Sequence, residues 1–533
     1  MDGQQFDYII IGSGFGGSVA ALRLAEKGYS VLVLEKGKKY ESKDFPKTNW
    51  NLREYLWVPG LYCYGFQKLT FYKHASILSG VGVGGGSLVY ANTLFYPPDS
   101  FFNHKSWNRF RDWKQTLEPH YLKAGKMMGR TKYDRINAED KVLREIACEY
   151  GREETFDTVN VGVYLGDTET ETDPYFNGKG PLRKGCIECG GCMVGCRENA
   201  KNSLDKNYLF FALKEGAKLL AETEAIKIDY NQGKYYVHTR PLRRSSPQNR
   251  TVFISRGIIL AGGTLGTLKL LLQNKYQYKT LTNISNCLGD KVLTNSETLC
   301  AVSGIKHKMN NGLAITSVFN PDDNTHIEVV KYPDGSNSLK WFFSLSATGA
   351  RSNFLRILKL LWNTISHPVA FIKTVFNFKW STGLIIFLVM QHIENYMQFR
   401  WGRGLFGYRL KVINTGKYKV PAYIDVGQKV MERYAEKTGG IAQNIIIEVA
   451  FNRATTAHIL GGCPMAEQVS EGVIDDLFRV HGYPNMYVVD GSAMQGNPGV
   501  NPSFSILAMA EYAMEQIPEK RHQTDSTDKK LIN

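Results

Sequence analysis

The chain has 533 residues, 43% of them hydrophobic, so it can bury the cores of two to four structural units of about 150 residues each. Its formal net charge is +15, which suits a solubilising surface or attraction to an anionic membrane. The zinc-finger spacing, RNA-binding signature and basic helix that would indicate nucleic-acid binding are missing.

Residues 1–5 are polar and no apolar run reaches about 18 residues, so the sequence predicts neither a secretory signal nor a membrane span. Four of the nine cysteines are clustered, which favours a reducing compartment over a disulfide framework. We therefore expect a cytoplasmic protein, with peripheral contact at the inner membrane surface as a further reading. The polar stretch 518–533 is expected to be a tail.

Residues 6–37 are typical of a strand, a tight turn, a helix and a second strand. Gly12, Gly14 and Gly17 fit G-x-G-x-x-G, in which glycines allow the turn, the approach of a pyrophosphate and close helix–strand packing. Glu35 ends the second strand, where a carboxylate can bind a ribose hydroxyl. The stretch predicts dinucleotide binding, and the motif alone does not separate FAD from NAD.

Residues 79–93, "SGVGVGGGSLVYANT", form a second glycine-rich stretch that can bring backbone against a flat ring or a phosphate. A flexible loop is the alternative, but the apolar run "SLVYA" argues against it. Later, residues 221–230 predict a strand, and residues 256–274 predict a buried strand, a Gly-Gly turn and an apolar helix. These segments are expected to return the chain to the first domain.

Between these blocks, Cys186, Cys189, Cys192 and Cys196 follow the C-x2-C-x2-C-x3-C spacing of bacterial ferredoxins. An iron–sulfur cluster would pass electrons from a reduced cofactor to a partner, whereas a four-cysteine zinc site would have no redox role. Structural thiols or a disulfide are the third reading. Arg197 replaces the proline that follows the ferredoxin run, and no second C-x2-C run exists, so the ferredoxin analogy is partial.

Residues 326–349 predict a hairpin of strands. Residues 351–376 have apolar side chains at positions 354, 357, 358, 361 and 365, which is helical spacing, with lysine and arginine between them. One interpretation is a helix that faces the core with its charges outside. The other is a basic amphipathic helix that rests on a bilayer.

Two stretches near the C-terminus, "AHILGGCPM" and "YVVDGSAMQGNPGVNPSFSILAMAE", carry the most specific pattern. Two further blocks are "IILAGGTLGTLKLLL" and "LGDKVLTNSE". Together with the two glycine-rich stretches, all of these blocks resemble the glucose–methanol–choline (GMC) flavoprotein oxidoreductases, and within them the bacterial cholesterol oxidase-like branch. The blocks span nearly the whole chain in the family's order. Members of this branch carry a similar cysteine-rich segment, so the four cysteines are expected within a flavoenzyme.

The resemblance implies an α/β (α+β two-domain) fold, in which a Rossmann-type FAD-binding domain receives an inserted substrate domain built on a mainly antiparallel sheet with helices. The FAD-binding domain would comprise residues 1–100, 206–300 and 456–517. An insertion with the cysteine loop would occupy 101–205, and the substrate domain 301–455. The residues implied to line FAD are Gly12, Gly14, Phe15, Gly17, Glu35, Gly82, Gly86, Ser87, Asn92, Thr93, Ala225, Asp490, Gly491, Asn501, Pro502 and Ser503.

The implied reaction is oxidation of CH–OH to C=O by hydride transfer to the flavin. His458 would accept the hydroxyl proton, because the pKa of a neutral imidazole lies near working pH. Asn501 would orient the hydroxyl, although asparagine at a helix entry is also a favoured cap. The preferred substrate is the 3β-hydroxyl of a sterol or steroid, and the electron acceptor is O2 or another acceptor. The alternatives are a dehydrogenase for a sugar or long-chain alcohol and a flavin and cysteine-cluster electron carrier.

Secreted cholesterol oxidases have a carboxylate that moves a ring double bond after oxidation, and alignment places Asn337 at that position. An amide cannot shuttle a proton, so the sequence predicts little or no isomerisation. The glycine block also reads "YANT" where those enzymes differ, so Asn92 and Thr93 leave the choice between oxidase and dehydrogenase open.

Overall fold

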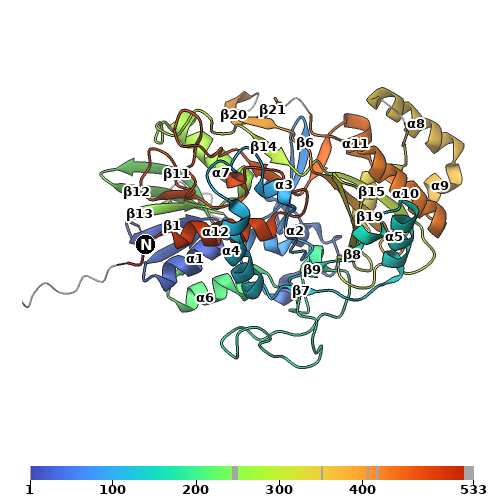
Figure 1. Ribbon diagram of the computed structural model, residues 1–533, viewed down its shortest axis with the longest axis horizontal. Helices are drawn as coiled ribbons and strands as arrows, with labels where there is room; N and C mark the ends of the chain where they lie inside the picture. Colours follow the sequence, from blue (N-terminus) through green and yellow to red (C-terminus); the bar gives the residue numbers. More distant parts are fainter. Residues whose placement is uncertain (1, 243–249, 350–351, 405–406, 416–418, 521–533) are drawn as a thin grey trace, which may run out of the picture.

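The computed structural model describes residues 2–242, 250–349, 352–404, 407–415 and 419–520 (Figure 1). Residues 521–533, most of the predicted polar tail, lie outside the described part of the chain. Two seven-stranded sheets organise the molecule, one toward each end of the long axis in Figure 1.

The first sheet has the order β10-β2-β1-β13-β12-β11, and β25 pairs with the second half of β13. Its parallel strands are mostly buried apolar runs, as expected where helices cover a sheet, except that β10 at the edge is partly exposed. A hairpin, β11–β12, extends one edge by antiparallel pairing. The strands are β1 (Gln5–Ile11), β2 (Val31–Leu34), β10 (Lys218–Leu220), β11 (Thr223–Asn231), β12 (Lys234–Pro241), β13 (Thr251–Leu260) and β25 (Met486–Val488).

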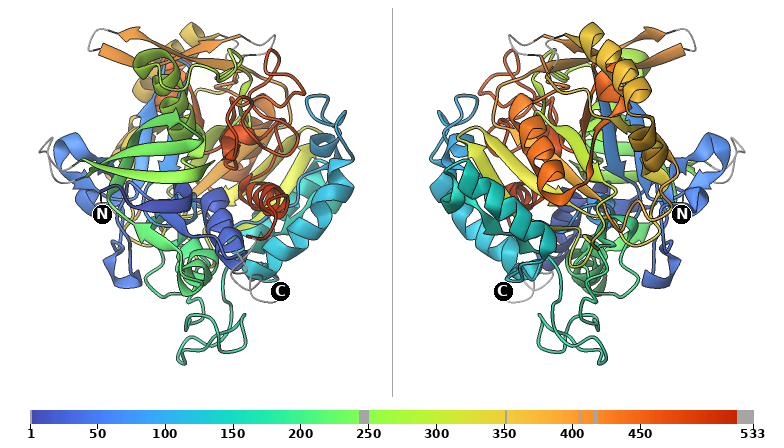
Figure 2. Two further views of the ribbon diagram at one scale, coloured as in Figure 1. Left: turned by 90° about the vertical axis from the view of Figure 1, so that its left-hand side faces the viewer. Right: turned by 90° about the vertical axis from the view of Figure 1, so that its right-hand side faces the viewer.

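Helices from distant parts of the chain pack together beside this sheet, as the left-hand view of Figure 2 shows. The crossover helix between β1 and β2 is α1, and it contacts both the C-terminal helix α12 and the central helix α6, while α12 also contacts α4. The helices are α1 (Phe15–Glu26), α4 (Trp113–Met127), α6 (Tyr208–Lys214) and α12 (Ser503–Glu515). The parallel β1–α1–β2 unit confirms the predicted Rossmann-type start of the chain.

The second sheet is antiparallel throughout, with the order β18-β22-β15-β19-β17-β16-β8. Helices α5 (Ala138–Glu149) and α10 (Asp425–Thr438) pack on one of its faces and close an apolar core. Its strands are β8 (Asp157–Thr158), β15 (Thr298–Ser303), β16 (Ile315–Asp322), β17 (Thr325–Val330), β18 (Phe343–Leu345), β19 (Ile385–Gln391) and β22 (Ile441–Ile445). The predicted class, a Rossmann-type unit joined to a mainly antiparallel sheet with helices, is confirmed.

The hairpin predicted over residues 326–349 is wrong. Its first part is β17, which forms a hairpin with the preceding strand β16, and its second part is β18 at the far edge of the sheet. Between these two strands, Asp334 and Gly335 belong to a loop that leads to a short 3-10 helix, Ser338–Phe342.

The helix predicted over residues 351–376 is present as two helices, α8 (Asn353–Ser366) and α9 (Pro368–Val375). Pro368 opens α9, because proline suits a first helical turn and interrupts a continuing helix. The two helices lie at the periphery, beyond the second sheet (Figure 1). Their apolar side chains are exposed, so the interpretation that they face the core is wrong.

Candidate active site

Two glycine-rich loops meet at the carboxyl end of β1. Gly12 has φ of +103°, and a Cβ atom there would lie 2.2 Å from the carbonyl oxygen of Ala261. A Cβ on Gly17 would lie 2.0 Å from the carbonyl oxygen of Gly12. Glycine is therefore required at both positions by the turn and by close packing.

Gly14 differs from these two, because a Cβ there would meet no described heavy atom closer than the Cα of Gly85, at 3.9 Å. The fold alone does not require glycine at this position. The open space lies at the start of α1, where backbone N–H groups and the helix dipole favour a phosphate. Phe15 closes the other side, with its ring against Gly86 of the second loop.

Glu35 joins the two loops through Ser13. Its carboxylate accepts hydrogen bonds from the backbone N–H and hydroxyl of Ser13, at 3.1 and 2.8 Å, and from the N–H of Gly37, at 2.9 Å. Ser13 Oγ in turn accepts from the N–H of Gly84 at 3.2 Å. Glu35 thus holds the loops together at the position from which a carboxylate binds ribose.

The second loop presents a buried amide without a partner. Asn92 is fully buried with φ of +72°, and neither side-chain amide atom has a hydrogen-bond partner among the described residues. A buried polar group without a partner is costly unless a ligand satisfies it. Ser503 at the start of α12 lies close by, since its hydroxyl donates to the carbonyl of Thr93.

The remaining residues predicted at the cofactor support the loops or border them. Ser87 Oγ donates to the carbonyl of Gly84 and accepts from the N–H of Leu204. Buried Asp490 accepts hydrogen bonds from Thr267 and Ser492, and burial raises the pKa of its carboxyl. Five others complete the set. Gly82 has φ of +141°, Ala225 lies in β11 at a register shift, Gly491 packs on Thr264, and Asn501 and Pro502 precede α12.

His458 lies between strands β23 (Ala454–Thr456) and β24 (Ile459–Gly461), buried beside a carboxylate. Its Nδ1 forms a short hydrogen bond with Glu297, which also accepts from the backbone N–H of Ala457 at 2.8 Å. Burial lowers the pKa of His458, but the charges of Glu297 and Glu328 outweigh burial and raise the pKa above its ordinary value. Because Nδ1 is held by Glu297, Nε2 is the nitrogen that can take a proton from a substrate.

Asn501 lies beside the buried Glu328 of β17. The Asn501 amide nitrogen lies 3.5 Å from a carboxylate oxygen of Glu328, and its amide oxygen has no partner in the described structure. Glu328 is fully buried, and its other oxygen lies 3.2 Å from His326. Asn295 links this group to His458, since its amide donates to the carbonyl of Val500 at 2.8 Å and lies 3.3 Å from Nδ1.

Asn337 does not belong to this group, so the placement that supported the expectation of little isomerisation is wrong. Its amide donates to the carbonyl of Phe378 and accepts from the N–H of Ser381, which fixes the loop after α9. The carboxylate beside Asn501 comes instead from Glu328.

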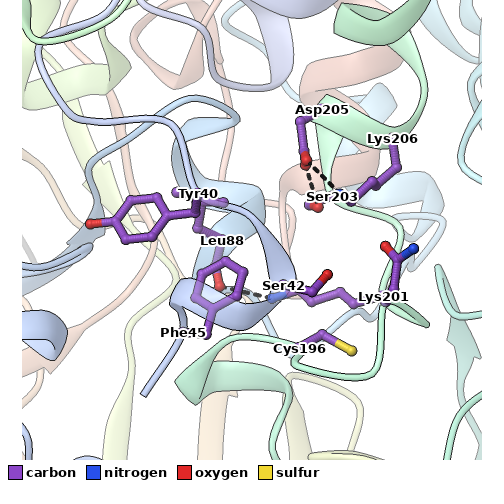
Figure 3. A pocket seen from close by; sticks show the side chains of 10 residues that line it. Tyr40, Ser42, Phe45, Leu88, Cys196, Lys201, Ser203, Asp205 and Lys206 are labelled. Carbon is purple, nitrogen blue, oxygen red and sulfur yellow. Dashed lines mark hydrogen bonds and ion pairs between the residues drawn. The ribbon is translucent and has the colours of Figure 1, made fainter. Parts of the chain in front are cut away.

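The cysteine loop packs against the second glycine loop. Buried Lys201 bridges them, since its ammonium donates to the carbonyls of Leu88, Tyr90 and Cys192 at 2.8–2.9 Å, and burial lowers its pKa to about 8. Figure 3 shows a pocket between this loop and residues 40–45, with Cys196 and Lys201 in its wall.

The predicted iron–sulfur or zinc site is not supported. All four cysteines are free thiols, and within the described ranges no group of three or more Cys, His, Asp or Glu side chains is arranged to hold a metal ion. The thiols lie at different depths, from exposed Cys189 to buried Cys192, and burial raises the pKa of the Cys192 thiol to about 11. Cys186 and Cys196 each accept a backbone N–H at 3.3 Å, so the structural-thiol reading fits the geometry.

Four residues of the site were missed by sequence reasoning, although three of them lie within motifs visible in the sequence. Glu297 ends the block "LGDKVLTNSE", in which an acid follows a buried strand. Ser13 lies within the first glycine motif, where its hydroxyl was not considered. Asn295 lies in the same block, two residues before Glu297, whereas Glu328 carries no local signal, because its contact with Asn501, 173 positions away, gives it its role.

Comparison with known proteins agrees with this geometry. The family model described as GMC oxidoreductase matches residues 183–275 and 422–510, and a model described as an NAD(P)-binding Rossmann-like domain matches residues 10–40. The chain is 40% identical, over 97% of its length, to a cholesterol oxidase of Acinetobacter baumannii, of which 95% is covered. It is also 40% identical over 97% of its length to a cholesterol oxidase of Mycobacterium tuberculosis, of which 91% is covered.

Among solved structures, pyridoxine 4-oxidase from Mesorbium loti has the same fold, with a TM-score of 0.60 at 14% identity. The match covers 97% of this chain and all of that one. Fold and site together define an oxidoreductase that acts on alcohol donors. The chain belongs to the GMC oxidoreductase family, and membership implies FAD as its cofactor.

The residues present fit that cofactor. The space beside Gly14 would be filled by a Cβ, as expected where a pyrophosphate approaches the backbone, and the unpartnered Asn92 amide can bond to a polar ring edge. Glu35 lies where a ribose hydroxyl would bind. Across the described ranges, no helix has both the length and the apolar character needed to cross a bilayer.

Proposed function

We propose that the protein oxidises the 3β-hydroxyl of a sterol or steroid to a ketone. The observation that carries this proposal is the buried group of His458, Glu297, Asn501 and Glu328, which supplies a proton acceptor and an amide at one point. The sterol class is supported by 40% identity to cholesterol oxidases over 97% of the chain.

In this reaction the alcohol loses a proton and a hydride. Asn501 holds the hydroxyl oxygen through an N–H of its amide, and His458 Nε2 takes the hydroxyl proton as the C=O bond forms. Bound FAD supplies the hydride acceptor. The charge of Glu297 stabilises the imidazolium produced on His458 and fixes its tautomer. The second substrate is O2 or another electron acceptor.

Isomerisation of the ring double bond is part of the same proposal. Moving a 5-ene to the 4-ene position requires a base that removes a proton from C4 and returns one to C6. Glu328 is a buried carboxylate next to Asn501, so it has the chemistry that an amide at position 337 would lack. This replaces the expectation of little isomerisation drawn from the sequence.

The test is the anaerobic absorption spectrum of the FAD-loaded protein before and after addition of a 3β-hydroxysteroid. Bleaching of the flavin band by this steroid, and no bleaching by its 3α epimer, is the expected result. The His458→Ala variant should bind FAD and bleach at least about a hundredfold more slowly, because it lacks the base. Bleaching by long-chain alcohols or sugars, with none by any steroid, would assign another alcohol to the site.

A further inference from the structure

Helices α8 and α9 are amphipathic, but their apolar side faces outward from the molecule. In a surface helix of a globular protein the apolar stripe faces the core and polar side chains face water. Here large apolar side chains point outward along both helices, and Ile365 is 75% exposed. This outer face is defined by Phe354, Leu358, Trp362, Ile365, Val369 and Ile372.

Polar side chains attach the same helices to the rest of the molecule. Arg356 is the one fully buried residue among the described residues of α8, and its guanidinium donates to Asn452 at 2.9 Å and lies over the Tyr423 ring. Asn363 donates to the carbonyl of Ser346 at 2.7 Å. Because these contacts fix the orientation of α8, the outward direction of its apolar stripe is a property of the folded protein.

The charge around the outer face has one sign. Residues 335–393 contain no aspartate or glutamate. The exposed cations of this stretch are Lys359, Lys373 and Lys379, whereas Lys340 and Arg356 are buried. A twofold contact between two copies through this face would bring these cations together, in a chain whose net charge is already +15. An anionic surface complements them instead.

We propose that the outer face docks the protein on the surface of an anionic lipid bilayer. The pair α8–α9 lies at the outside of the molecule in Figures 1 and 2, where a flat surface can approach it. Helix α8 has 14 residues, about 21 Å of length, so it lies in the interface and does not span the hydrocarbon core. The aromatic and aliphatic side chains insert, and Lys373 and Lys379 contact headgroups.

The experiment is sedimentation of the FAD-loaded full-length protein with two kinds of sterol-free vesicle, pure phosphatidylcholine and phosphatidylcholine with phosphatidylglycerol. We expect binding to the anionic vesicles that weakens as salt is raised. The double variant Trp362→Ser, Ile365→Ser should bind at least about tenfold more weakly, since two large apolar side chains no longer insert. Its matched control is Leu122→Ser, Leu182→Ser, two exposed leucines elsewhere on the surface, which should bind as the parent does.

A second pair of variants tests the charge. Lys373→Glu, Lys379→Glu should abolish the preference for anionic vesicles, whereas Lys126→Glu, Lys141→Glu on α4 and α5 should keep most of it. Equal binding of the parent and the Trp362→Ser, Ile365→Ser variant would overturn the proposal. A dimer in solution that this variant dissociates, without vesicle binding by the parent, would assign the face to a second copy. Because the vesicles carry no sterol, failure here leaves the proposed oxidation untouched.

Discussion

At the scale of single residues, the His458–Glu297 contact sets the pH dependence of the proposed reaction. His458 takes a proton only when neutral, so kcat/KM falls as the pH drops through its pKa. Glu297 raises that pKa, and its removal lowers it. We expect Glu297→Gln to shift the acidic limb of the kcat/KM profile to lower pH, and to lower kcat.

The control for this variant is another histidine–carboxylate pair. Asp229 lies 2.6 Å from His238 on the β11–β12 hairpin, and Asp229→Asn should leave the pH profile unchanged. If Glu297→Gln lowered kcat at every pH without moving the acidic limb, Glu297 would serve only to position the imidazole.

Glu328 allows a prediction that separates oxidation from isomerisation. In Glu328→Gln the amide occupies nearly the same volume, but it cannot carry a proton between two carbons. We expect a 5-ene-3-ketone to accumulate, with release of the 4-ene product slowed by at least about a hundredfold and oxidation less affected. Product analysis by ultraviolet absorbance distinguishes the two ketones. A variant that forms the 4-ene product at the parent's rate would remove Glu328 from this role.

The sequence identified the parts of the site that lie within motifs. His458, Asn501, Glu35 and the glycines occur in short segments whose spacing itself reflects the geometry. Glu328 could not be identified in this way, because its role depends on the register of β17 in a sheet and on a loop that begins 170 residues later. Asn337 was misassigned for the same reason, since only its contacts with Phe378 and Ser381 in the fold place it in another loop.

At the scale of secondary-structure elements, periodicity predicted which segments are helices and strands but did not predict their partners. The strand signals of β17 and β18 were correct, yet three strands separate them in the sheet. The spacing of the apolar residues in α8 likewise predicted an apolar stripe on a helix, but it did not predict whether that stripe faces the core or the outside. A hydrophobic pattern gives the direction of side chains relative to one another, whereas their direction relative to the core depends on contacts such as Arg356–Asn452.

The first glycine loop gives a prediction at this scale. Gly14→Ala should fold normally, because its Cβ meets no described atom within 3.8 Å, but should retain FAD at least about tenfold less well. Flavin absorbance per protein after gel filtration measures retention. Gly125→Ala in α4, where a Cβ makes only ordinary contacts, is the control and should retain FAD.

A second glycine of the same loop should respond differently. A Cβ at Gly17 would overlap the Gly12 carbonyl, so Gly17→Ala should lose soluble folded protein as well as FAD. Full FAD retention by Gly14→Ala would mean that the space beside Gly14 does not receive the pyrophosphate.

At the scale of the whole molecule, one buried carboxylate joins segments from the beginning, middle and end of the chain. Glu511 of α12 pairs with Arg23 of α1 at 2.7 and 2.9 Å and accepts from the hydroxyl of Tyr208 of α6 at 2.8 Å. Lys123 of α4 lies 3.2 Å away. Burial raises the pKa of Glu511, but its hydrogen bonds and the charges of Arg23 and Lys123 outweigh burial and lower it.

Removal of this carboxylate should weaken the assembly of the four helices. Glu511→Ala leaves the nearly buried Arg23 guanidinium and the Tyr208 hydroxyl without their partner, so we expect the free energy of unfolding at pH 7 to fall by about 3 kcal/mol. Urea denaturation followed by tryptophan fluorescence measures the change. Glu149→Ala removes an exposed ion pair with Arg433 and should leave the urea midpoint unchanged.

The same network predicts how the difference between parent and variant depends on pH. Since the folded state lowers the pKa of Glu511, its contribution is complete above the ordinary glutamate pKa and is lost as the pH falls through the lowered value. The urea midpoints of the parent and Glu511→Ala should therefore approach each other on acidification below about pH 4. A gap that stayed constant over this range would mean that the packing of α12, and not the charge of Glu511, holds the three chain segments together.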